Sequence, residues 1–426
     1  MTQPEPFSMF DADQLAACVQ CGFCLSSCPT YETTKLEEHG PRGRILAMRL
    51  VDEGELSIDD PEVVDSLETC VQCRACEVVC PSLVQFGSLI ETARAEIAER
   101  QPPRGLAGRL QAVVLWLVTR RSLVRAGGVL LAFAQALRLD RVLPARVRPA
   151  RRVRLGDTLR GYRLPPPGAP VRGDAYLFRG CVMDGLFRDV HRATAQVLAA
   201  VGYRPRFEPA PPCCGALSAH GGREDHAHAL AESTIAAYAG TEGPIVVNSA
   251  GCGAAMKEYG KLLGTDEARA FSARVRDLSE LVTPQEVAAR GREVGLTLGY
   301  QAPCHLRNVQ RLSDEGRALV AAIPGLTLLE PDDEQQCCGS GGLYSYLQPS
   351  FGDAMLARKD ASLRRTGAQG VVSANPGCAM QIARAGWEVH HPAQLLARSL
   401  VGAQQQGPSA LAADTFATIQ PDDLAG

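Results

Sequence analysis

The sequence CVQCGFCLSSCP at residues 18–29 recurs as CVQCRACEVVCP at residues 70–81. Both copies follow the pattern C-x2-C-x2-C-x3-C-P. Three thiolates at intervals of three residues on one tight loop can reach three corners of an iron–sulfur cube, and the fourth, aimed away past the proline, ligates the other cube. The spacing therefore predicts two [4Fe–4S] clusters with crossed ligation, one held by Cys18, Cys21, Cys24 and Cys80 and the other by Cys70, Cys73, Cys76 and Cys28.

Zinc is the alternative for clustered cysteines. It typically takes C-x2-C pairs separated by a spacer, so an uninterrupted triplet followed by Cys-Pro, present twice, fits zinc poorly. The chain has 16 cysteines among 426 residues, which is below the range of a disulfide scaffold. Half of them lie in the two motifs, and this clustering favours metal ligation.

The overall composition is that of a globular protein with two or three domains, because 426 residues exceed the usual size of one domain. The 44 Lys and Arg nearly balance the 47 Asp and Glu, which argues against a nucleic-acid-binding protein. The N-terminus has acidic residues where a secretory signal needs basic ones, and the chain has no run of about 20 apolar residues. We expect a cytoplasmic protein that does not cross a membrane.

The first block, residues 1–100, is expected to be helical. Apolar residues recur on one side of a helix that Pro41 could start and Gly54 could end, and a second short helix is expected at about 61–67. Because β-type patterning is missing, we expect a helical two-cluster domain in place of a compact small ferredoxin.

The second block, residues 101–170, is strongly basic. Between Arg104 and Arg154 it has twelve Arg, no Lys and one acid, around apolar stretches such as VVLWLV. This pattern suits an amphipathic surface for an anionic membrane or an acidic partner. The alternative is a linker of helices packed on the protein's own core. The sequence PPPGAP at 165–170 ends the block.

The third block is an internal repeat that forms two lobes, residues 171–290 and 291–400. In each lobe, cysteines follow short apolar runs typical of buried strands, and helical stretches lie between them, so we expect two α/β lobes with thiols at the carboxyl ends of strands. The repeated order is Cys, CysCysGly, Cys, and its members are Cys181, Cys213, Cys214 and Cys252, then Cys304, Cys337, Cys338 and Cys378. The tail at 401–426 is expected to be mobile.

The thiols of this repeat are candidates for one or two additional metal or iron–sulfur centres. Each set of four is enough for one centre, with Gly215 or Gly339 relieving the turn after the paired cysteines. Buried apolar cysteines or a redox pair are the alternative. Among nearby polar residues, His305 is expected to be structural and His220 to face solvent.

With its two cluster motifs followed by two CysCysGly repeats, the chain resembles the iron–sulfur subunit of bacterial glycolate oxidase over residues 13–400. The more specific stretches are CVQCGFCLSSCPTY, GPRGRI, CVQCRACEVVCPS, SAGCGAAMKEYG and CCGSGGLYSY. The resemblance implies a flavin-dependent glycolate dehydrogenase in which FAD-containing partner subunits oxidise glycolate to glyoxylate. This subunit would pass the electrons toward a quinone at the cytoplasmic membrane face.

Related families leave two alternatives. Subunits of lactate and glycerol-3-phosphate dehydrogenases share the repeat, and so does heterodisulfide reductase, which would make the chain a thiol or disulfide oxidoreductase. In the heterodisulfide-reductase relatives each repeat ends in C-x2-C, whereas Ala255 and Gln381 occupy the last position here. The expected fold class is therefore α+β with several domains: a helical ferredoxin-type domain with two clusters, a helical linker, and two α/β CysCysGly lobes.

Overall fold

The computed structural model describes residues 9–101, 113–142, 151–168, 170–332 and 335–401. The expected tail at 401–426 lies almost wholly outside the described residues. No helix of the described part of the chain is both long and apolar enough to cross a bilayer.

Residues 9–101 form a small helical domain. Prolines occupy the first turns of α2, α3 and α4, where a missing N–H costs nothing. One apolar side of α3 packs on α4 and α6 through Met48, Leu67 and Ile90, all fully buried. The helices are α1 (Ala12–Ala17), α2 (Pro29–Thr34), η1 (Glu37–His39), α3 (Pro41–Asp52), α4 (Pro61–Glu68), α5 (Ala75–Val78) and α6 (Phe86–Arg100). The two helices expected here from the sequence are confirmed.

The basic segment packs on the first lobe. Its helix α8 (Arg121–Ala136) lies against α10 so closely that a Cβ added at Gly128 would fall 2.4 Å from the carbonyl oxygen of Gly185. The remaining elements are a helical stretch at 113–118, η2 (Leu139–Val142) and α9 (Leu155–Leu159). This contact is the one expected of a linker packed on the protein's own core.

Two lobes of the same topology follow, each around a four-stranded parallel sheet. The strand orders are β2-β1-β3-β4 and β6-β5-β7-β8, with Tyr176 opposite Ile245 in the first sheet and Leu298 opposite Gly370 in the second. In both sheets the order reverses beside the first strand, where α/β folds place their sites. The internal repeat and its two expected α/β lobes are confirmed.

The elements of the first lobe are β1 (Gly173–Leu177), α10 (Val182–Leu186), α11 (Arg188–Ala200), β2 (Tyr203–Arg206), α12 (Ala216–His220), α13 (Glu224–Ala237), β3 (Ile245–Val246), α14 (Ala250–Lys257), α15 (Tyr259–Leu263), α16 (Asp266–Ser272), β4 (Val275–Arg276), η3 (Leu278–Glu280) and α17 (Pro284–Arg290). Those of the second lobe are β5 (Leu296–Tyr300), η4 (His305–Val309), α18 (Ser313–Ala321), β6 (Leu326–Leu329), α19 (Tyr344–Leu347), α20 (Pro349–Arg365), β7 (Gly370–Val372), α21 (Pro376–Ala383), β8 (Val389–His390) and α22 (Pro392–Val401).

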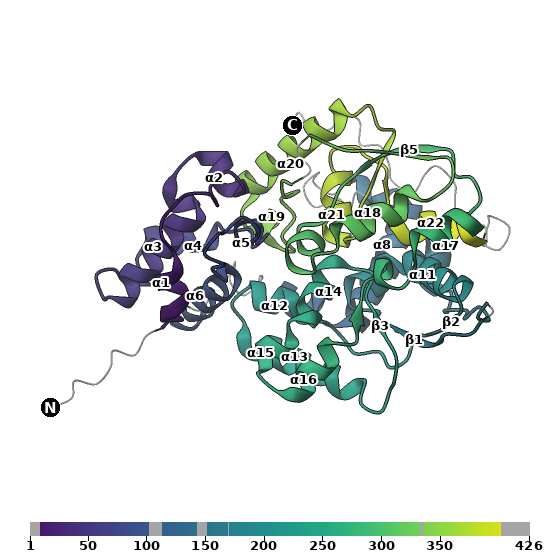
Figure 1. The fold of residues 1–426 in the computed structure, drawn as a ribbon, viewed down its shortest axis with the longest axis horizontal. Helices are drawn as coiled ribbons and strands as arrows, with labels where there is room; N and C mark the ends of the chain where they lie inside the picture. The colour runs from purple at the N-terminus through teal and green to yellow at the C-terminus, as the bar shows by residue number, and fades with distance from the viewer. Residues whose placement is uncertain (1–8, 102–112, 143–150, 169, 333–334, 402–426) are drawn as a thin grey trace.

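The two lobes share one hydrophobic core, to which α11 of the first lobe and α22 of the second contribute fully buried residues such as Leu198 and Leu396. The helical N-terminal domain, purple in Figure 1, lies at one end of the molecule and meets both lobes along one side. Its α2 packs on α20, and Arg358 of α20 donates to the carbonyl oxygen of Glu32 at 3.0 Å. The second cluster motif thus lies at the junction between the helical domain and the second lobe, where Asn308 donates to the Cys73 carbonyl.

Candidate functional site

The first group of motif cysteines surrounds a small cavity in the helical domain. Its lining includes Cys18, Cys21, Cys24 and Cys80, the four residues predicted for one cluster, together with Cys76. The loop bends at Gln20 and Gly22, which adopt positive φ angles of 58° and 85°. The Gln20 side-chain amide donates to the thiol sulfur of Cys18 at 3.6 Å. Burial raises the pKa of the Cys24 thiol to about 11.

The second group joins the fourth cysteine of the first motif to three of the second motif. Cys28, Cys70, Cys73 and Cys76 are all buried, and their thiols lie close enough to interact electrostatically. Burial raises the pKa of the Cys73 and Cys76 thiols. A metal centre that binds here must displace thiol protons, and four soft sulfur donors suit iron–sulfur ligation.

Arg44 is a site residue that the sequence analysis did not single out, although it lies in the stretch GPRGRI. Its guanidinium is fully buried and donates to the carbonyl of Ser66 at 2.6 Å and to the hydroxyls of Thr30 and Thr69 at 3.2 Å. One terminal nitrogen lies 4.0 Å from the sulfur of Cys28. Arg44 thus brings a positive charge to the second group and ties both motifs together.

The thiols of the first lobe converge at the carboxyl ends of three neighbouring strands. Cys181 follows β1, the pair Cys213 and Cys214 follows β2, and Cys252 lies in α14 after β3. The sulfurs of Cys181 and Cys213 are 3.7 Å apart, and Cys214 contacts both Cys213 and Cys252. Contacts with Cys181 and Cys214 lower the pKa of the Cys213 thiol, and the pKa values of Cys181 and Cys214 are raised.

The second lobe repeats this arrangement. Cys304 contacts Cys337, and Cys338 contacts Cys378, at the ends of β5, β6 and β7. Each set is thus gathered within its own lobe. The expected glycine turns are confirmed, since Gly215 and Gly339 have φ angles of 80° and 81°. In this lobe Gln381 stands where the heterodisulfide-reductase relatives have the last cysteine of C-x2-C. Its side chain is structural, because it donates to the carbonyl oxygen of Gly352.

The thiols of the second lobe lie against the N-terminal motif. Cys73 interacts electrostatically with Cys304 and Cys337, within an apolar cluster that also contains Val71 and Tyr344. Asn308 of η4 donates to the carbonyl oxygen of Cys73 at 2.7 Å, and Tyr344 donates to that of Thr69 at 2.8 Å. These contacts link the second group of motif cysteines to the second lobe.

Two histidines lie where the helical domain meets both lobes. The rings of His220 and His305 have centroids 5.3 Å apart, and Nδ1 of His220 lies 3.4 Å from a carboxylate oxygen of Glu91 in α6. The expectation that His220 faces solvent holds only in part, because its side chain is 24% exposed and packs against Glu91 of the docked helical domain. Nothing in the local sequence indicates this contact.

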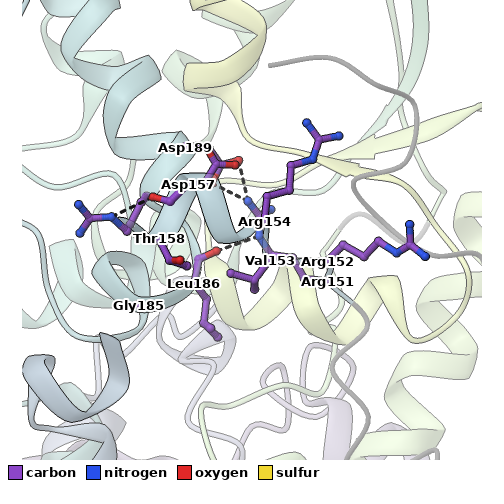
Figure 2. A pocket seen from close by; sticks show the side chains of 10 residues that line it. Arg151, Arg152, Val153, Arg154, Asp157, Thr158, Gly185, Leu186 and Asp189 are labelled. Atoms are coloured by element: carbon purple, nitrogen blue, oxygen red, sulfur yellow. Dashed lines mark hydrogen bonds and ion pairs between the residues drawn. The ribbon is translucent and has the colours of Figure 1, made fainter. Parts of the chain in front are cut away.

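Several arginines of the basic segment belong to the fold of the first lobe. Figure 2 shows Arg151 turned toward Asp189, with which it forms two hydrogen bonds of 2.6 Å, while Arg152 extends away from that pair. Arg151 also donates to the carbonyl of Leu186 at 3.0 Å. Arg121 forms an ion pair with Asp184 at 3.7 Å. Part of the positive charge therefore has an internal structural partner.

Among the described residues, no group of three or more His, Cys, Asp or Glu side chains is arranged around a single metal ion. Two family models match the chain: a 4Fe-4S dicluster domain over residues 14–84, and a cysteine-rich domain over residues 175–257 and again over 298–383. The chain therefore carries two [4Fe–4S] clusters.

Several proteins are similar to nearly the whole chain. A probable glycolate oxidase iron–sulfur subunit of Bacillus subtilis (strain 168) is 34% identical over 87% of this chain and 89% of its own length. The glycolate oxidase iron–sulfur subunit of Escherichia coli (strain K12) is 32% identical over 91% and 94%, respectively. One subunit of the fumarate reductase (CoM/CoB) of Methanothermobacter marburgensis is 27% identical over 89% and 69%. The chain therefore belongs to the family of glycolate oxidase iron–sulfur subunits.

Proposed function

We propose that this chain is the electron-transfer subunit of a flavin-dependent glycolate dehydrogenase. FAD-containing partner subunits oxidise glycolate to glyoxylate, and this subunit passes the electrons toward a quinone acceptor at the cytoplasmic face of the membrane. The observation that carries the proposal is that the helical domain gathers its motif cysteines into two groups. The chain is also similar to glycolate oxidase iron–sulfur subunits along nearly its full length.

The proposed ligands follow the crossed pattern. Cys18, Cys21, Cys24 and Cys80 hold one cluster, and Cys70, Cys73, Cys76 and Cys28 hold the other. Iron–sulfur clusters on thiolates carry single electrons at potentials set by charge, hydrogen bonds and burial. The chain's own residues supply these influences, because Gln20 donates to Cys18 and the buried Arg44 faces Cys28.

We further propose that the two four-thiol sets of the lobes hold an additional iron–sulfur or metal centre each. The support is that both sets gather four buried or half-buried thiols at the switch point of a parallel sheet. The set of the second lobe adjoins Cys73, so a centre there would lie beside the second N-terminal cluster. The proposed domains are residues 1–100, 101–170, 171–290 and 291–400.

The test is to purify the chain anaerobically, measure iron and sulfide, and record EPR spectra after adding glycolate and the flavoprotein subunits. We expect at least about eight irons per chain, two cubes' worth, and cluster reduction by glycolate. Fewer irons, or no reduction by glycolate when dithionite does reduce the clusters, would overturn the proposal. Lactate in place of glycolate distinguishes the nearest alternative substrate.

Crossed ligation has its own test. Cys28→Ser should perturb the EPR signal of the cluster held by the second motif, and Cys80→Ser that of the first. The matched variant Cys24→Ser should perturb the signal of the first motif's cluster, and Cys76→Ser that of the second motif's cluster. If each serine perturbs only the cluster of its own motif, ligation is not crossed.

A further inference from the structure

The linker helix α8 carries apolar residues on two opposite sides. The side toward the first lobe has Val124, Gly128 and Ala132, which recur at every fourth residue. The other side has four large apolar residues, the last being the residue directly after the helix: Leu123, Leu130, Phe133 and Leu137. At about 3.6 residues per turn, the two sets lie on opposite sides of the helix. The first lobe therefore covers only one of them.

The second set, which we call the outer face of α8, is open to solvent along its length. The exposed fractions are 38% for Leu123, 69% for Leu130, 55% for Phe133 and 55% for Leu137. Within α8, every exposed residue other than one serine and one arginine is apolar or glycine. A surface helix normally turns charged and polar residues to water, and a contiguous exposed apolar surface marks an interaction site. The outer face of α8 therefore needs a partner.

Arginines border this face and set its charge. Arg125 lies beside the outer face, Arg120 directly precedes α8 and Arg138 follows it, and all three are exposed. Residues 113–139 contain no Asp or Glu. Trp116, which is 49% exposed, lies under the Arg120 guanidinium with 3.7 Å from the guanidinium carbon to the ring centroid. The charge around the face is thus of one sign and complements an anionic surface.

This chemistry separates three kinds of partner. A second copy of the chain would bring arginines together with no acid on either face, which disfavours self-association. A specific protein interface surrounds its apolar centre with a rim of hydrogen-bonding residues, but apart from arginine the exposed side of α8 offers only Ser122. Leucine, phenylalanine and tryptophan beside arginine are typical of helices that lie among the head groups of an anionic membrane.

We propose that the outer face of α8 lies in the head-group region of an anionic lipid membrane. Leu130, Phe133 and Leu137 reach the boundary of the acyl chains, and Arg120 and Arg125 contact the lipid phosphates. The inference deepens the proposed function, on which the location at a membrane rests. Because the inner side of the same helix packs on the first lobe, α8 joins that lobe to the membrane surface.

The test is flotation of the anaerobically purified full chain with vesicles of equal parts phosphatidylglycerol and phosphatidylcholine, and with vesicles of phosphatidylcholine alone. The wild type should partition at least about tenfold more strongly into the anionic vesicles. The double variant Leu130→Gln, Leu137→Gln should lower that partition coefficient at least about tenfold, because it removes apolar area and keeps every charge. The matched control is Leu36→Gln, Leu46→Gln, which replaces two exposed leucines of the helical domain and should stay within about twofold.

Tryptophan fluorescence provides a second readout close to α8. The chain has two tryptophans, and Trp387 is 8% exposed and donates to Asp360 at 2.6 Å. A blue shift of the emission on adding anionic vesicles should therefore come from Trp116 and be absent in Trp116→Phe. Flotation of the wild type without a blue shift would place the lipid contact elsewhere and overturn the proposal.

The proposal also fails if the wild type does not float, floats equally with both kinds of vesicle, or floats no better than the Leu130→Gln, Leu137→Gln variant. If the wild type does not float and this variant instead loses association with the purified flavoprotein subunits, the outer face binds a protein. The outcome is separable from the proposed function. Cluster reduction by glycolate without flotation overturns only the docking surface, and flotation that depends on Leu130 and Leu137 without reduction by glycolate overturns only the proposed substrate.

Discussion

Replacing Arg44 by Met should lower the reduction potential of the cluster that Cys28 is proposed to ligate. The buried guanidinium lies 4.0 Å from the Cys28 sulfur, and a positive charge there stabilises the added electron. At an effective dielectric constant of about 20, two unit charges at that distance interact by about 4 kcal/mol. Because the electron is shared over the whole cluster, this is an upper limit, so the potential should fall by tens of millivolts and by less than about 170 mV.

The assay is a redox titration followed by EPR on the wild type, Arg44→Met, Arg44→Lys and the surface control Arg100→Met. Both Arg44 variants lose the guanidinium hydrogen bonds to the hydroxyls of Thr30 and Thr69, so both should melt at a lower temperature. Only Arg44→Met loses the charge and should shift the potential. Equal shifts in the Met and Lys variants, or none in either, would refute the electrostatic reasoning.

Three further predictions concern stability and docking. Burial lowers the pKa of His391 to about 4, below its unfolded value, so the free energy of unfolding should fall by about 2 kcal/mol as the pH drops from above about 6.5 to 5. Urea titrations at pH 7 and pH 5 should show a smaller loss of unfolding free energy in His391→Gln, and a loss equal to that of the wild type would count against this. In α8, Gly127→Ala should stabilise the protein by about 0.5–1 kcal/mol because its Cβ meets no other atom. Gly128→Ala should lower the melting temperature because its Cβ clashes with a carbonyl of α10. Melting temperatures that shift in the same direction in both variants, measured by calorimetry, would contradict the close packing of α8 on α10. Reversing the exposed Arg120 and Arg125 to Glu should weaken flotation with anionic phosphatidylglycerol vesicles at low salt, and unchanged flotation would exclude electrostatic docking.

Local structure could be predicted well because local patterns encode it. Pro41 begins α3, the apolar runs before the repeat cysteines form β1, β3, β5 and β7, and Gly215 adopts the positive φ angle expected of its turn. These features depend on periodicity and on residues a few positions apart. The basic segment was ambiguous for the same reason, since its amphipathic pattern does not say whether a membrane or the first lobe covers its apolar side.

The thiols of the site could be predicted from the sequence, but the residues that surround them could not. The cysteine spacing predicts which thiols are drawn together, whereas Arg44 is conspicuous only once its guanidinium is seen bridging the two motifs. His220 has a polar local sequence and was expected in solvent, but the docked α6 brings Glu91 against it.

The sequence alone determined the two cluster motifs, the helical and α/β character of the parts, and the repeat that gives each lobe four thiols. Only the tertiary structure decided that the second lobe's thiols lie against Cys73 and that the first lobe covers one side of α8 and leaves the other exposed. The contact from Asn308 to the Cys73 carbonyl joins residues 235 positions apart. Such contacts depend on how whole domains pack against each other, and residue spacing within a motif carries no information about that packing.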